Sequence, residues 1–255
     1  MILGFLGTGH ITSSVIKGIF KSKLKVKKIY ISPRNKILAK KLSKRFKKIT
    51  ISNNNQQLID SSNWIFLAIT PKVGNKILNK LHFNKNKKII SFISTINLNN
   101  LKKITKNKNV TRVIPLPFIG MKKGPIILCP EDKNVKNFFN QLGEVIEVKS
   151  EKISKGFWAT SSFMASFYNL FLTTSNWLVS KGVNRKAAEK YVRELFLALS
   201  EDSINKKQLS LKQLVLESQT PGGTNAHVLR ELKKKKFYKV QQKVLNSVFK
   251  KFKTR

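Results

Sequence analysis

The N-terminal end constrains the fold of this chain more than any other segment. Met1 to Leu6 is a short apolar run that ends in Gly7-Thr8-Gly9. Apolar residues then recur at helical spacing, at Ile11, Val15, Ile16 and Ile19. The pattern predicts a strand, a tight turn and a helix. In such a turn the first glycine permits the bend, and the second lets the backbone approach a pyrophosphate at the helix N-terminus. We therefore predict dinucleotide binding, although Thr12 stands where a third glycine or alanine usually sits.

Strands and helices continue to alternate through the N-terminal part of the chain. Further strands are predicted at Lys28 to Ser32, Ile49 to Ile51, Trp64 to Ile69, Lys88 to Ser94, Val110 to Ile114, Ile126 to Leu128 and Glu144 to Val148. Helices are predicted between them at Lys36 to Phe46, Val73 to Lys80 and Val135 to Leu142. Such alternation predicts an α/β fold with a mostly parallel sheet covered by helices on both faces.

After about Glu151 the pattern changes, because only helical stretches follow. They are predicted at Ile153 to Ser180, Arg185 to Ser203, Leu209 to Glu217, Thr224 to Lys235 and Tyr238 to Phe252, with Gly182 as a stop signal. The first stretch is apolar on too many faces for a free surface helix. We expect it to be buried against a neighbour, for which another subunit is one candidate.

The formal net charge of +39 is the most extreme feature of the composition. Nearly all of it is lysine spread from Lys17 to Lys253, without the interleaved aromatic residues that a base-stacking surface requires. This favours a solvated basic surface that attracts anions, a phosphorylated cofactor included, over a dedicated nucleic-acid partner. Nucleic-acid binding is the last-ranked alternative.

Few other features carry chemistry. The apolar runs are too short to cross a bilayer and the N-terminus lacks the pattern of a signal peptide, so we expect a cytoplasmic protein without a membrane partner. Cys129 is the single cysteine, and the three histidines, His10, His82 and His227, are scattered without acidic clusters. No metal site is predicted.

The end of the second predicted strand indicates which dinucleotide is bound. An NAD-preferring enzyme places an acidic residue there, on the ribose hydroxyl. This chain has Ser32-Pro33-Arg34-Asn35 with no carboxylate nearby. A hydroxyl and a guanidinium suit a 2′-phosphate, so NADPH is predicted over NADH. The alternative is that Arg34 is an ordinary exposed side chain.

The run Thr220-Pro221-Gly222-Gly223-Thr224-Asn225-Ala226-His227 lies between two predicted helices. Proline before paired glycines predicts a tight loop, and we expect Thr224 or Asn225 to cap the helix that follows. That is a complete structural explanation. The same geometry also directs free N–H groups at whatever lies before the helix, so a substrate carboxylate could bind there.

With these motifs in place, the chain resembles the pyrroline-5-carboxylate reductases over nearly its whole length. Gly4 to Thr12 is similar to the family's first turn, Ala68-Ile69-Thr70-Pro71 to its Ala-Val-Lys-Pro strand end, Arg112-Val113-Ile114-Pro115 to its Arg-Val-Met-Pro, and Thr220 to Thr224 to its Ser-Pro-Gly-Gly-Thr loop. Leu142-Gly143, Val145 to Val148 and Glu151 match the close of its cofactor domain. The resemblance implies a Rossmann-type NADP-binding domain at residues 1–150 and an all-α dimerisation and substrate domain at residues 151–255, in a homodimer or higher homo-oligomer.

The resemblance also implies site residues. Those expected to bind the cofactor are Leu6, Gly7, Thr8, Gly9, His10, Ile11, Ser32, Arg34, Asn55, Ala68, Thr70 and Pro71. Gly222, Gly223, Thr224 and Phe163 are expected to bind the substrate. Thr224 and Asn225 are the expected catalytic residues, with Asn225 facing the ring nitrogen.

Four positions depart from the family pattern on the substrate side. Thr70 replaces a lysine, Leu116 an asparagine, Phe163 a small serine, and Asn225 the threonine that hydrogen-bonds the imine nitrogen. The expected function is NADPH-dependent reduction of 1-pyrroline-5-carboxylate to proline. Two alternatives are a reductase of another, more apolar imine or carbonyl compound, and a non-catalytic dinucleotide-binding homologue.

Overall fold

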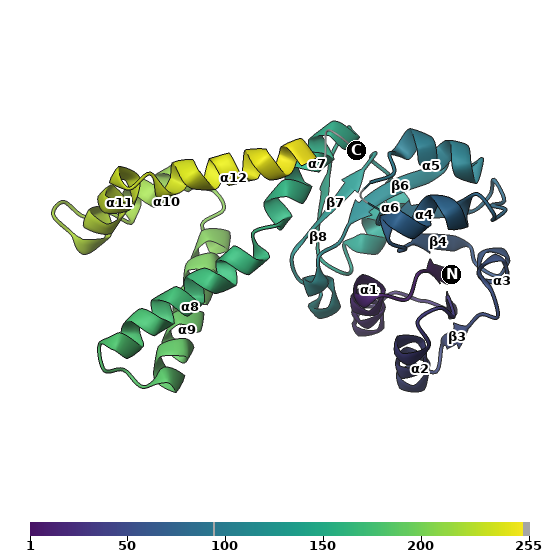
Figure 1. Cartoon of the computed structure of the whole chain (residues 1–255), viewed down its shortest axis with the longest axis horizontal. Coiled ribbons are helices and arrows are strands. Elements are labelled where there is room, and N and C mark those ends of the chain that lie inside the picture. The colour runs from purple at the N-terminus through teal and green to yellow at the C-terminus, as the bar shows by residue number, and fades with distance from the viewer. Residues whose placement is uncertain (94, 252–255) are drawn as a thin grey trace. The chain divides into compact units, whose positions relative to one another are not determined.

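The computed structural model describes residues 1–93 and 95–251, without the side chains of residues 71–73. It divides into two compact units (Figure 1). The first is Met1–Trp158 together with Lys251, and the second is Ala159–Lys250. In the described part of the chain, no helix is both long and apolar enough to span a membrane.

The first unit is built on an eight-stranded sheet of order β3-β2-β1-β4-β5-β6-β7-β8. All neighbouring strands pair in parallel except β6 and β7, which are antiparallel. The strands are β1 Ile2–Leu6, β2 Lys28–Ile31, β3 Ile49–Ile51, β4 Trp64–Leu67, β5 Lys88–Ser91, β6 Val110–Ile114, β7 Pro125–Cys129 and β8 Glu144–Glu147. The predicted α/β class and all eight predicted strands are confirmed. Ser94, the predicted end of the fifth strand, lies outside the described residues.

Helices cover both faces of this sheet, as predicted. One apolar core lies under α1 (His10–Lys21), α2 (Lys36–Arg45) and α6 (Lys133–Phe139), and a second lies under α3 (Asn55–Asp60), α4 (Pro71–Leu78), α5 (Leu98–Thr105) and α7 (Glu151–Ser161). The sequence patterns did not predict α3, α5 or the 3₁₀ helix η1 (Pro117–Met121). These are short elements, for which apolar periodicity is a weak signal.

The central strands can be continuous apolar runs because both of their faces are covered. In β4, Phe66 faces the first core while Ile65 and Leu67 face the second. On the same face of the sheet, the Phe5 ring of β1 stacks on the Phe66 ring of β4 with the two centroids 4.3 Å apart. Buried parallel strands therefore bring the carboxyl ends of β1, β2 and β4 to one edge, where loops can form a site.

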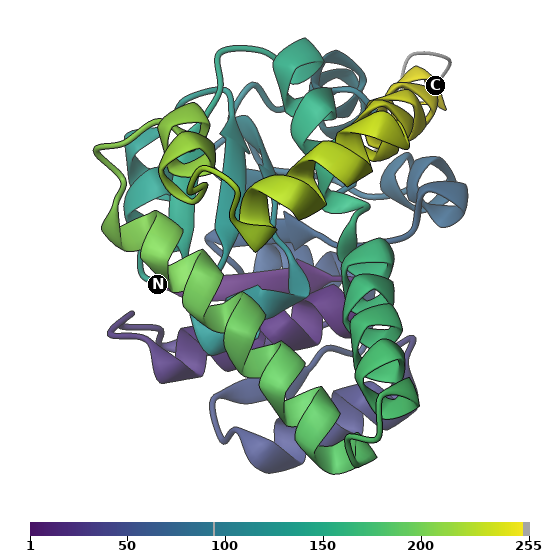
Figure 2. The ribbon, with the colours of Figure 1, turned by 90° about the vertical axis from the view of Figure 1, so that its left-hand side faces the viewer.

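The second unit is helical, as predicted. Its helices are α8 Met164–Ser180, α9 Arg185–Asn205, α10 Leu211–Glu217, α11 Thr224–Lys234 and α12 Phe237–Lys251. In Figure 2, α8 and α9 form a helical hairpin whose arms diverge from the connecting turn, and Phe171 of α8 stacks on Phe196 of α9 with centroids 4.7 Å apart. Gly182 ends α8 with a φ of +92°, which confirms the predicted stop. The predicted end at Phe252 lies outside the described residues.

The prediction of one long helix from Ile153 to Ser180 is wrong, because α7 ends at Ser161 and α8 begins at Met164. At the break, the Ser162 hydroxyl donates to the Ala159 carbonyl at 2.6 Å. The backbone N–H groups of Ser162 and Phe163 donate to residues three positions earlier. Such bonds tighten the last turn and compete with continuation of an α-helix.

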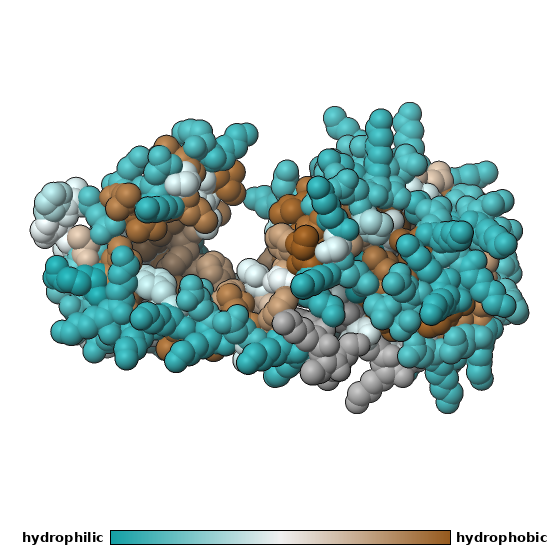
Figure 3. All heavy atoms as spheres, turned by 90° about the horizontal axis from the view of Figure 1, so that it is seen from above, coloured by the Kyte–Doolittle hydropathy of each residue, from teal (hydrophilic) through white to brown (hydrophobic). Residues whose placement is uncertain are grey.

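Large apolar side chains are exposed on the second unit, where brown surface appears at the left of Figure 3. They include Tyr168, Leu172, Trp177, Tyr191, Leu199 and Val244. Exposed apolar side chains in such number are typical of a surface that binds another protein. This is consistent with the expectation that the apolar helical stretch packs against a neighbour.

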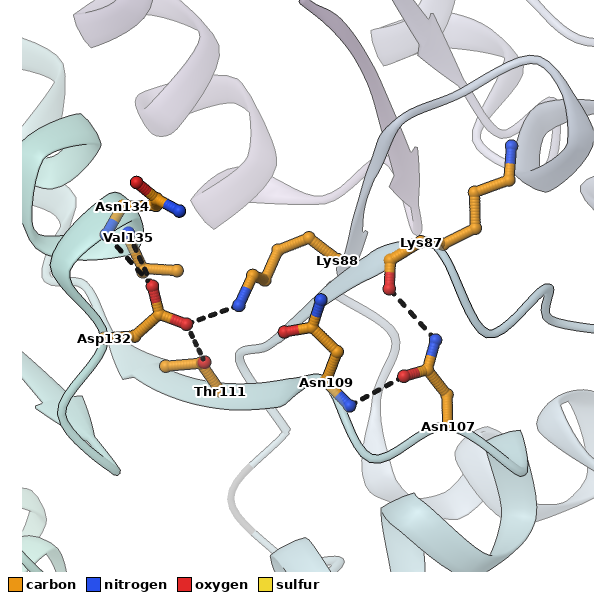
Figure 4. A network of polar contacts seen from close by, with 8 residues as sticks. All are labelled: Lys87, Lys88, Asn107, Asn109, Thr111, Asp132, Asn134 and Val135. Carbon is orange, nitrogen blue, oxygen red and sulfur yellow. Dashed lines mark hydrogen bonds and ion pairs between the residues drawn. The ribbon is translucent and has the colours of Figure 1, made fainter.

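A polar network joins β5, β6 and the start of α6 (Figure 4). Asp132 forms an ion pair with Lys88, and its other carboxylate oxygen accepts from the Asn134 and Val135 N–H groups at 3.1 and 3.0 Å. Burial would raise the pKa of Asp132, but the Lys88 ammonium and these hydrogen bonds outweigh it and hold the pKa below its ordinary value. Asp132 therefore acts as a charged helix cap.

Replacing Asp132 by alanine should lower the free energy of unfolding by about 2 kcal/mol at neutral pH, roughly half from the cap and half from the ion pair. Asp132→Asn keeps a capping oxygen and should lose only about 1 kcal/mol. Because the folded-state pKa is depressed, the carboxylate's contribution is present above the unfolded value of about 3.9 and is lost as the pH falls through the folded value. Urea unfolding across this range should show the wild type converging on Asp132→Asn, and a constant gap would contradict the role of the charge.

Candidate functional site

A cleft of about 610 Å³ lies at the carboxyl ends of β1, β2 and β4. Four segments line it: the β1–α1 turn, the β2–α2 loop with the start of α2, the start of α3, and the end of β4 with α4. None of the described residues in its lining is acidic, whereas Arg34 and Lys36 are cationic. The chain order reverses at this edge, between β1 and β4, which is where open α/β sheets bind ligands.

The glycine turn is held by hydrogen bonds that it donates to Ser32, the residue after β2. The Gly7 N–H donates to the Ser32 hydroxyl at 3.0 Å, and the Thr8 hydroxyl donates to the Ser32 carbonyl at 2.7 Å. Gly7 has a φ of +110°, and a Cβ there would lie 2.4 Å from the Ala68 carbonyl oxygen. Only glycine fits this position, so Gly7 is required by the fold itself.

Gly9 differs from Gly7, because a Cβ there would meet no protein atom within 4 Å. Its backbone is extended, with φ −108°, a conformation open to any residue. Gly9 also lines the cleft and precedes α1, which begins without a side-chain cap. The absence of a side chain therefore leaves space in the cleft beside the unpaired N–H groups of the first turn of α1, an arrangement that fits a pyrophosphate.

The loop before α11 forms the second candidate site, in the second unit. Gly222 has a φ of +72°, and the Gly223 N–H donates to the Thr220 carbonyl at 2.9 Å. The expectation that Thr224 or Asn225 caps α11 is wrong. The N-cap is Gly223, no side chain caps the helix, and the Asn225 amide instead donates to the Ser218 carbonyl at 3.1 Å. The first turn of α11 therefore presents backbone N–H groups that no side chain satisfies.

Comparisons with known proteins match both units. Residues 2–97 match the family model described as NADP oxidoreductase coenzyme F420-dependent, and residues 151–254 match the model described as pyrroline-5-carboxylate reductase dimerisation. The chain belongs to the pyrroline-5-carboxylate reductase family. It is thus an NAD(P)-dependent oxidoreductase by family, and its second unit is a dimerisation domain. The search of curated proteins found no match.

Solved structures share the fold, two pyrroline-5-carboxylate reductases along the whole chain and an imine reductase along most of it. The 1-pyrroline-5-carboxylate reductase of Streptococcus pyogenes superposes with a TM-score of 0.85 at 21% identity, covering 100% of this chain and 99% of that chain. The Plasmodium falciparum pyrroline carboxylate reductase, with NADP bound, gives 0.81 at 21% identity, covering 100% and 97%. An Aspergillus terreus imine reductase with NADPH4 gives 0.57 at 15% identity, covering 86% and 78%.

Most of the predicted cofactor residues lie together in the first cleft. Its lining includes Gly7, Thr8, Gly9, Ser32, Arg34, Asn55, Ala68 and Thr70. Among the described side chains, Leu6, His10 and Ile11 do not belong to that lining: Leu6 is buried in β1 and His10 is exposed at the start of α1. The Pro71 side chain lies outside the described residues. The space beside Gly9 and the two cations show that the cleft fits NADP(H), the cofactor of this family.

Lys36 and Ile37 line the cleft but were not predicted. The available signal was position, since both fall in the first turn of α2 directly after the strand end. Ser32 in turn is buried, and its hydroxyl already accepts the Gly7 N–H. The exposed cations beside the cleft are therefore Arg34 and Lys36, and both also border a second hollow with Asn53, Asn54 and Asn55.

The four departures from the reductase family pattern are distributed over both units. Thr70 and Leu116 are N-cap residues, of α4 and η1, in the first unit. Phe163 lies at the break before α8, where its carbonyl accepts the Phe167 N–H at 2.8 Å. Asn225 follows the glycine loop in α11.

Proposed function

We propose that this reductase converts 1-pyrroline-5-carboxylate to proline with NADPH. The observation that carries the proposal is the uncapped start of α11 behind the Gly222-Gly223 loop, in a chain whose other unit holds a cleft that fits NADP(H). NADPH, when bound, supplies the hydride that reduces the imine carbon. The chain's own residues then have to hold the substrate and manage its charge.

The glycine loop suits a carboxylate for two reasons. The N–H groups of Thr224, Asn225 and Ala226 have no side-chain cap, and a helix N-terminus attracts negative charge. A Cβ at Gly222 would meet no protein atom within 4 Å, so the space beside this residue is open, whereas a Cβ at Gly223 would lie 2.2 Å from the Thr220 hydroxyl oxygen. We infer that this loop and the Thr224 hydroxyl bind the substrate carboxylate, and that the Asn225 amide donates to the ring nitrogen in place of its present acceptor, the Ser218 carbonyl.

On the cofactor side, we infer that Arg34 and Lys36 select NADPH by contacting its 2′-phosphate. Both are exposed cations in the segment that follows β2. None of the described residues in the cleft lining is a carboxylate that could accept a hydrogen bond from a ribose hydroxyl. Ser32 also lines the cleft, and its hydroxyl accepts the Gly7 N–H while keeping its own O–H to donate. NADPH should therefore support faster turnover than NADH.

Asn225→Ala should lower kcat/KM for 1-pyrroline-5-carboxylate about 100-fold, since it removes a hydrogen bond made to the reacting imine. NADPH oxidation followed by absorbance measures this, with NADH assayed in parallel. Asn225→Thr restores the family side chain and should retain turnover. Asn246→Ala, at an exposed position of α12, is the matched control and should behave as wild type. Equal activity of Asn225→Ala and wild type would contradict the assigned role.

One observation favours a second candidate, reduction of a more apolar cyclic imine. Phe163 and Leu116 both replace small or polar family residues. A panel of cyclic imines with and without a carboxylate separates the two candidates. Preference for the imine without a carboxylate would favour this second function, and NADPH binding without turnover of any substrate would favour a non-catalytic homologue.

A further inference from the structure

A second cleft in the first unit shares no lining residue with the cofactor cleft. Its volume is about 550 Å³, and it lies between the second half of α1, the end of α2 and η1. Neither the cofactor nor the substrate proposal involves these residues. The cleft is therefore a separate feature that the proposed reaction does not explain.

Close packing of η1 on α1 forms one side of this cleft. A Cβ at Gly18 would lie 2.4 Å from the Ile119 carbonyl oxygen, so only glycine lets η1 come this near. Phe118, the residue before Ile119, lines the cleft. One wall of the cleft is therefore η1, held in place by its close packing on α1.

Aromatic rings form much of the remaining lining. Phe20 of α1 and Phe46 after α2 stack with centroids 4.1 Å apart and planes 4° apart. Together with Phe118 they are only half-buried, so their surfaces remain partly accessible in the cleft. Accessible, ordered aromatic rings provide a surface on which a flat ligand can stack.

Three cations line the same cleft as these rings. Lys17 and Lys21 lie one turn apart on α1, and the Arg45 guanidinium lies 5.5 Å from the centroid of the Phe46 ring. Among the described residues of the lining there is no carboxylate, and the ion pairs found in the described structure do not include these three side chains. Three cations that line one cleft without a carboxylate make its electrostatic potential positive, so an anion would be attracted there.

We propose that this cleft binds a small planar aromatic anion. The ring packs on Phe20, Phe46 and Phe118, and the anionic group accepts hydrogen bonds from Lys17, Lys21 and Arg45. The volume falls in the range of about 300 to 1,000 Å³ that is usual for small-molecule sites. Lysines are abundant on the whole surface, but charge complementarity combines here with a concave aromatic wall, and the shape and charge together define the ligand class.

The test is calorimetric titration of 1-naphthyl phosphate into the full-length protein with the cofactor cleft saturated by NADPH. The double variant Lys17→Gln and Lys21→Gln should bind about tenfold more weakly or worse, because two charge-assisted contacts are lost. Lys40→Gln with Lys44→Gln removes the same charge from exposed positions of α2 outside the cleft, and should change affinity less than about twofold. Circular dichroism confirms that both variants fold.

A second arm tests recognition of the ring. Inorganic phosphate should bind the wild type at least about tenfold more weakly than 1-naphthyl phosphate, since it lacks the stacking surface. Phe118→Leu should reduce this preference. Equal weakening by both lysine pairs, equal affinity for the two phosphates, or no binding of 1-naphthyl phosphate to the wild type would each overturn the proposal.

Discussion

Replacing Gly9 by valine should abolish most NADPH binding while leaving the fold nearly as stable as the wild type. The backbone of Gly9 is extended and a Cβ added there meets no protein atom within 4 Å, so the branch point of the new side chain clashes with nothing in the fold. The side chain instead fills cleft volume beside the first turn of α1. Losing two charge-assisted hydrogen bonds to the pyrophosphate corresponds to about 100-fold weaker binding or more.

Fluorescence titration with NADPH and thermal unfolding, made on the same samples, separate the two effects. Gly156→Ala is the matched control, because its added Cβ also meets nothing within 4 Å but lies in α7, outside the cleft. Gly7→Ala is the contrasting variant. With φ +110° and the Ala68 carbonyl 2.4 Å from its Cβ, it should lower stability as well as binding. Unchanged NADPH affinity in Gly9→Val would refute the placement of the pyrophosphate.

Replacing Glu151 by alanine should destabilise the first unit by about 3 kcal/mol or more, because it leaves a buried charge without a partner. Arg112 in β6 is only 2% exposed, and its Nη1 lies 2.8 Å from Glu151 Oε1 at the start of α7. Burial lowers the pKa of Arg112, and the Glu151 carboxylate opposes that shift. The guanidinium also donates to the Ile96 carbonyl and lies 5.4 Å from the centroid of the Trp158 ring.

Urea unfolding followed by tryptophan fluorescence measures the loss. The second Glu151 oxygen accepts the Leu98 N–H at 2.9 Å, so Glu151→Gln keeps an acceptor there and should cost less than Glu151→Ala. Arg112→Met combined with Glu151→Gln removes the orphaned charge and should recover much of the stability. A loss below about 1 kcal/mol in Glu151→Ala would show that water, not Glu151, compensates Arg112.

The local sequence pattern was enough to predict the strands, several helices and the glycine turn of the first unit. The run Met1 to Leu6, the glycines and the apolar spacing from Ile11 to Ile19 are contiguous, and each reports a property of its own segment. The same holds for the strands and for Gly182, whose positive φ ends α8 as expected. The cleft lining contains Arg34 and Asn55 because both follow predicted elements at the carboxyl edge of a parallel sheet.

Predictions failed where the local structure depended on which acceptor a polar side chain hydrogen-bonds. Ser162 breaks an apparently continuous helix by bonding to Ala159, and Asn225 bonds to Ser218 instead of capping α11. A hydroxyl or amide group can hydrogen-bond any of several nearby acceptors, and apolar periodicity does not indicate which one it contacts.

The sequence by itself therefore determined the fold class, the glycine turn and the family, because these depend on short runs whose burial and backbone preferences are local. Only the tertiary structure decided that Gly7 is required by the fold while Gly9 leaves space in the cleft, and that Arg112 pairs with Glu151. It also decided that Lys17, Lys21 and Arg45 line one cleft with the stacked rings of Phe20 and Phe46. The physical reason is that these relations join residues far apart in the chain. Strand order and helix packing bring them together, and no local pattern records those distances.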